Sequence, residues 1–115
     1  MTSLELAEAM LKGLESPGVE ESRAHYIDST QYGNICMACA LGVALIGKYN
    51  GNFRAAEVAY DEIRYADDEM DSSDIFARLL DISPFLAEQV ETMHLQAEPI
   101  MKIAAWLKER GGAPA

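Results

Sequence analysis

Apolar residues recur three and four positions apart along most of the chain, the spacing of one face of an α-helix. The first such segment covers residues 3 to 14, and Thr2 and Glu5 at its start have the spacing of a capping box. Further segments with a start signal or an apolar stripe lie at 53 to 66 after Asn52, around 75 to 80, after Ser83-Pro84 and after Glu98-Pro99. The pattern therefore predicts a mostly α protein.

One segment has no polar face: the thirteen residues from Ile35 to Gly47 are apolar or small throughout. A helix of this kind is surrounded by protein. The run is too short for a membrane span, which needs about twenty residues. We therefore expect 35–47 to be a buried central helix in a compact single-domain bundle of five or six helices that covers residues 1–115.

Two segments do not fit the helical pattern. Aromatic and β-branched residues between 24 and 35 favour a small β-hairpin, which would have to lie on the helices because an isolated hairpin is only marginally stable. Gly111-Gly112 ends the last helix, so residues 112–115 are expected to form a frayed tail.

The charge balance excludes some classes of partner. Nine basic and nineteen acidic residues give a net charge of −10, which argues against direct binding of nucleic acid and against an anionic membrane surface. The first residues contain no basic stretch followed by an apolar run, so no secretory signal is expected. With two cysteines only, we expect a reducing, cytoplasmic setting.

Cys36-x-x-Cys39 is the sharpest chemical motif. On the expected central helix both thiols lie on one face near the helix start, where the helix dipole favours a reactive thiolate. The other reading is that both cysteines are small hydrophobic core residues, since no βαβ pattern surrounds them. A zinc site would have to recruit His25 and His94 as well, at spacings unlike paired zinc ligands, so we expect no metal and no cofactor.

The negative charge is concentrated between residues 57 and 74, which hold eight acids and one base. An EF-hand reading fails because Ser72 and Arg78 occupy the positions that need glycine and glutamate. The segment is either a solvated face or a field that attracts a basic partner. The candidate residues of such an interaction patch are Asp67, Asp68, Glu69 and Asp71.

Two motifs carry a resemblance. Cys39-Ala40-Leu41-Gly42-Val43-Ala44-Leu45 and Ile103-Ala104-Ala105-Trp106-Leu107 resemble small uncharacterised bacterial and phage proteins with a Cys-Ala-Leu-Gly-x-Ala helix and a C-terminal Ile-Ala-x-Trp-Leu helix. Those proteins often carry a Leu-Asn-Asp turn before the final helix, which is missing here around Met93-His94-Leu95. The resemblance implies a compact helical domain in which Cys39 packs in the core, and it implies no activity.

The sequence contains no nucleophile elbow, phosphate-binding glycine loop or His-Glu-x-x-His motif. His25 and His94 have no partner visible in the sequence, and we expect each to be a surface or half-buried residue. We therefore expect a non-enzymatic protein–protein interaction or assembly module that forms a homodimer. The alternatives are an acidic mimic that binds a basic or nucleic-acid-binding protein through 57–74, and a thiol-redox protein. Four methionines motivate the apolar interface: Met10, Met37, Met93 and Met101.

Overall fold

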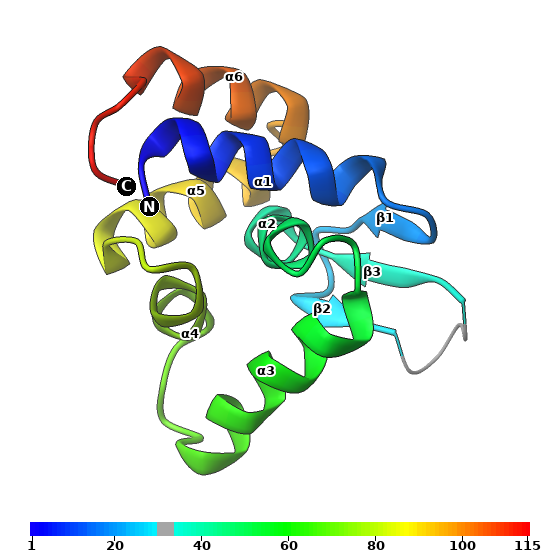
Figure 1. Ribbon diagram of the computed structural model, residues 1–115. Coiled ribbons are helices and arrows are strands. Elements are labelled where there is room, and N and C mark those ends of the chain that lie inside the picture. Colours follow the sequence, from blue (N-terminus) through cyan, green and yellow to red (C-terminus); the bar gives the residue numbers. More distant parts are fainter. Residues whose placement is uncertain (30–33) are drawn as a thin grey trace.

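The computed structural model describes residues 1–29 and 34–115, and across these the chain forms six helices and a three-stranded sheet (Figure 1). The elements in chain order are α1 (Ser3–Glu15), β1 (Val19–Glu21), β2 (Ile27–Asp28), β3 (Cys36–Ala38), α2 (Ala40–Lys48), α3 (Phe53–Ala66), α4 (Ser72–Leu80), α5 (Pro84–Leu95) and α6 (Ile100–Arg110). The mostly α fold predicted from the sequence is confirmed.

α2 lies in the middle of the molecule, and every residue from Ala40 to Gly47 is buried. α1 packs along it, α3, α4 and α5 contact it, and the sheet lies at its N-terminal end (Figure 1). The expectation of one helix over 35–47 is wrong in its first part, because Cys36–Ala38 is a strand and Cys39 is the N-cap of α2. A continuous apolar run does not distinguish a buried strand from a buried helix.

The sheet has the order β1-β3-β2, with β1 parallel and β2 antiparallel to β3. β3 is therefore hydrogen-bonded to a strand on each side. The hairpin expected at 24–35 is wrong in extent: β2 lies inside that range, but its partner begins at Cys36, and β1 adds a third strand. Residues 30–33 of that expected hairpin lie outside the described residues.

The crossing of α1 and α2 depends on two glycines. A Cβ at Gly13 would overlap the backbone oxygen of Val43, and a Cβ at Gly47 would overlap that of Ala9. The backbones of α1 and α2 thus lie in direct contact at this crossing.

The helix starts agree with the sequence signals. Thr2 and Glu5 form the predicted capping box, and Asn52 and Ser83 cap α3 and α5 with their side chains. Within the described residues, no helix is both long and apolar enough to cross a membrane.

The expectation of a frayed tail at 112–115 is wrong. Ser3 N–H donates to Ala113 O (2.9 Å), Ala115 N–H donates to Met1 O (3.1 Å), and Thr2 and Pro114 form a β-bridge. These bonds hold the last residues against the start of α1, and Figure 1 shows the two ends of the chain side by side. Backbone pairing between distant segments leaves no pattern in the tail itself.

Candidate functional site

A polar cluster around the buried side chain of His94 joins the sheet to three helices; we call it the histidine junction (Glu21, Arg23, Ala40, His94 and Ile100). His94, near the end of α5, is only 1% exposed. Its Nδ1 accepts the N–H of Ala40 at 3.4 Å, and its Nε2 lies 2.9 Å from Glu21 Oε1. Because a backbone N–H can only donate, Nδ1 carries no proton, and Nε2–H therefore donates to the carboxylate.

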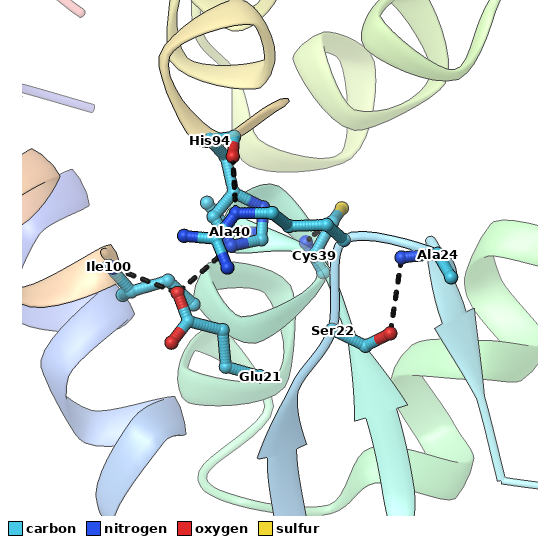
Figure 2. A network of polar contacts seen from close by, with 9 residues as sticks. Glu21, Ser22, Ala24, Cys39, Ala40, His94 and Ile100 are labelled. Atoms are coloured by element: carbon cyan, nitrogen blue, oxygen red, sulfur yellow. Dashed lines mark hydrogen bonds and ion pairs between the residues drawn. The ribbon is translucent and has the colours of Figure 1, made fainter. Parts of the chain in front are cut away.

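Glu21 has a second role in the histidine junction. Its Oε1 also accepts the N–H of Ile100 at 3.0 Å, at the start of α6, and Figure 2 shows the side chain between His94 and Ile100. Arg23 Nε donates to the backbone oxygen of His94 at 2.7 Å. A carboxylate at a helix N-terminus is electrostatically favourable. The end of β1 and the residues that follow it are thereby hydrogen-bonded to α5 and α6.

The expectation of a surface or half-buried position is wrong for His94 and confirmed for His25. Burial lowers the pKa of His94 from its usual value of 6.5, and this outweighs the opposing effect of the bond to Glu21. A proton on Nδ1 would face the N–H of Ala40 at the positive end of α2, so the geometry also favours the neutral ring. His25 is half-buried, and its Nδ1 lies 2.9 Å from Ser22 Oγ.

The two cysteines do not lie on one helix face. Cys36 is in β3 and Cys39 caps α2, where its Sγ accepts the N–H of Gly42 at 3.5 Å. Both thiols are free and buried. Burial raises the pKa of Cys36 to about 11 and that of Cys39 to about 12. Thiols of this kind are protonated near pH 7 and are weak nucleophiles.

The residues considered for zinc are only partly brought together. Cys39, His25 and His94 line one hollow of about 140 Å³ beside α5, whereas Cys36 lies in β3. Both ring nitrogens of His94 are already bonded to Glu21 and Ala40. Across residues 1–29 and 34–115, no group of three or more His, Cys, Asp or Glu side chains is placed to hold a metal ion.

Two acidic hollows lie on either side of Tyr26, which is 48% exposed and lines both. The first, of about 420 Å³, lies between α4 and α5, and we call it the α4–α5 hollow. The second, of about 260 Å³, lies between β2 and α3. We call their seven carboxylates the acidic face: Asp28, Glu57, Asp61, Asp71, Asp74, Glu88 and Glu91.

Burial, and after it neighbouring like charges, raises the pKa of two of these carboxyl groups. For Glu91 the largest cause is burial, followed by the neighbouring Asp71 and Glu88, and a hydrogen bond from Ser72 Oγ (3.0 Å) opposes the shift. For Asp61 the causes are burial and then Glu57. Both shifts mean that the ionised form is disfavoured in the protein alone, and a bound cation would relieve this penalty.

The predicted interaction patch is only partly in this site. Asp71 lines the α4–α5 hollow, whereas Asp67, Asp68 and Glu69 are exposed on the turn between α3 and α4 and line neither hollow. Glu88 and Glu91 were missed. Their spacing of three on one helix was a signal for a shared polar face, but it does not indicate which other element this face meets.

The outer face of α5 borders a further hollow of about 420 Å³. The residues that line this hollow, which we call the α5 groove, come from α5 and its C-cap residue: Phe85, Glu88, Gln89, Thr92, Met93 and Gln96. Phe85 is 77% exposed, which is unusual for so large an apolar side chain.

No protein-family model, curated protein or solved structure matches this chain. The interpretation of the site therefore depends on its own geometry and chemistry.

Proposed function

We propose that the protein is a non-enzymatic binding module that recognises a basic segment of a partner protein through the acidic face. One observation carries the proposal: carboxylate residues from β2, α3, α4, α5 and the N-cap of α4 line two hollows that share Tyr26. Among the described residues that line the two hollows, Arg64 is the only lysine or arginine. This arrangement differs from an acidic loop because the charges surround concave space.

Arginine and lysine side chains fit such a site for two reasons. A cation between several carboxylates gains Coulomb energy from each of them, and the partial burial of Glu91 lowers the screening by water. The exposed ring of Tyr26 provides a face over which a guanidinium can stack. The wider negative field, from a net charge of −10, accelerates encounter with a basic partner.

The chemistry of the buried polar groups supports a binding role over an enzymatic one. Both ring nitrogens of His94 are engaged within the fold, and both thiols have raised pKa values. Two free cysteines also fit a reducing, cytoplasmic setting.

The test uses a fluorescent peptide of eight arginines and fluorescence anisotropy. We expect the variant D71N/D74N/E88Q/E91Q to bind about 10-fold more weakly or worse, since each exposed pair contributes about 0.5 kcal/mol. Affinity of the unaltered protein should fall steeply with salt. The matched control E8Q/E15Q/E20Q/E109Q removes the same charge from exposed sites outside the acidic face. Equal weakening in the two variants would overturn the proposal, because binding would then depend on net charge alone.

A further inference from the structure

We infer that the outer face of α5 docks an amphipathic basic helix of the partner protein, whose basic edge enters the α4–α5 hollow and whose apolar edge covers Phe85 and Met93. The inference rests on the proposed function and specifies the kind of partner segment. Three features of α5 support it: a largely exposed face, its continuity with the α4–α5 hollow, and its charge.

The α5 groove follows one side of a single helix. Its lining residues have sequence separations of three, one, three, one and three, which is the spacing of one helix face. From Phe85 to Gln96 this face extends about 17 Å at 1.5 Å per residue. It is long enough for about three turns of a second helix laid alongside. Phe85 lies at one end of this face, and its exposed ring is the largest apolar side chain that lines the groove.

The α5 groove and the α4–α5 hollow form one surface. Glu88 and Thr92 line both of them. Leu95, 62% exposed, lies on the side of the hollow. A helix in the groove thus meets apolar side chains along one edge and carboxylates along the next. An occupant with apolar and basic residues on adjacent stripes satisfies both.

The negative charge of the α5 groove and the α4–α5 hollow indicates which kind of partner can bind there. The described residues that line the groove and the hollow include four carboxylates and no lysine or arginine: Asp71, Asp74, Glu88 and Glu91. A second copy of this chain would bring the same carboxylates against themselves, which costs energy through like-charge repulsion. An anionic membrane surface is repelled for the same reason. A basic partner is attracted, and its apolar edge covers Phe85.

The test compares two peptides of identical composition in arginine, leucine and glutamine. In one, the helical form places leucines on one stripe and arginines on the adjacent stripe; in the other, the order is shuffled. We expect the amphipathic peptide to bind at least 10-fold more tightly and to become helical on binding, as measured by anisotropy and circular dichroism. F85S should remove most of this preference and leave binding of the eight-arginine peptide unchanged. V58S, at an exposed position on α3 outside these hollows, is the control.

The outcomes separate this inference from the proposed function. If the eight-arginine peptide binds through the acidic face but the two test peptides bind equally, or F85S has no effect, the inference is wrong and the proposed function stands. If no basic peptide depends on the acidic face, both fail. If sedimentation shows a dimer of the unaltered protein that F85S dissociates, the groove binds a second copy and the inference is overturned.

Discussion

The histidine junction and the acidic face both contain half-buried carboxylates, but the groups around them are opposite in kind. Glu21 is surrounded by donors, since His94 Nε2–H and Ile100 N–H both point at its Oε1. Glu91 is surrounded by acceptors, with one donor from Ser72 and the carboxylates of Asp71 and Glu88 nearby. Burial costs each carboxylate hydration. The fold compensates this cost at Glu21 and leaves it largely uncompensated at Glu91, and an uncompensated charge is available to a partner.

The largest effect on stability is expected from removing the carboxylate of Glu21. Glu21→Ala leaves the donors of His94 and Ile100 without their acceptor, and we expect a loss of about 2–3 kcal/mol in the free energy of unfolding. Urea denaturation measures this loss. Glu20→Ala changes the neighbouring exposed residue of β1 and should cost less than about 0.5 kcal/mol. Similar losses in the two variants would show that the histidine junction does not stabilise the fold.

The two buried thiols should react slowly with an alkylating reagent. Burial raises the pKa of Cys36 from 9.0 to about 11, and a rise of two units lowers the thiolate fraction about 100-fold. Iodoacetamide at pH 8 should therefore alkylate the native protein at least about 100-fold more slowly than the protein in concentrated urea. Mass spectrometry of samples taken at successive times gives the alkylation rates of the native and the denatured protein. Equal rates would mean that a cysteine is accessible and reactive, as a thiol-redox protein requires.

The pH dependence of stability should differ in sign between the two regions. The pKa of His94 is lowered in the fold, so its contribution is complete above about 6.5 and is lost as pH falls below that value toward the folded pKa. The pKa values of Asp61 and Glu91 are raised, so their contribution is complete below their usual values of 3.8 and 4.5 and is lost as pH rises through the folded pKa.

Denaturation curves between pH 7.5 and 5.5 test the histidine part of this prediction. Stability should fall toward the acidic end, by less than in Glu21→Ala because protonation directly disrupts only the bond to Ala40. His94→Gln should flatten the dependence, whereas His25→Gln should keep it. A slope that persists in His94→Gln would assign it to another group.

The smallest effects are expected when one glutamate in each region is replaced by glutamine. Glu91→Gln keeps an acceptor for Ser72 and removes a repelled charge, so it should stabilise the protein by about 0.5 kcal/mol at low salt. Glu21→Gln also keeps an acceptor oxygen but weakens two charge-assisted bonds, so it should destabilise by about 1 kcal/mol. Urea denaturation at pH 7 gives both values. The same sign in both variants would contradict the distinction between the two regions.

The sequence by itself determined most of the helical framework. Start signals and apolar stripes are local, because a cap and its helix lie within a few residues, and they correctly predicted the beginnings of α1, α3, α5 and α6. The burial of Ala40–Gly47 followed from the absence of any polar position in that run. The same run did not show where β3 ends and α2 begins, because strand and helix share an apolar composition when both are buried.

Only the tertiary structure decided the two polar regions and the position of the tail. Glu21 and His94 are 73 residues apart in the chain, and nothing near either residue indicates the other. Glu91 and Asp71 became neighbours through the packing of α4 against α5, which also left Asp67 and Asp68 outside the α4–α5 hollow. Periodic patterns describe which side of an element is buried. Which distant side chains meet depends on how the elements pack, and that is a property of the whole fold.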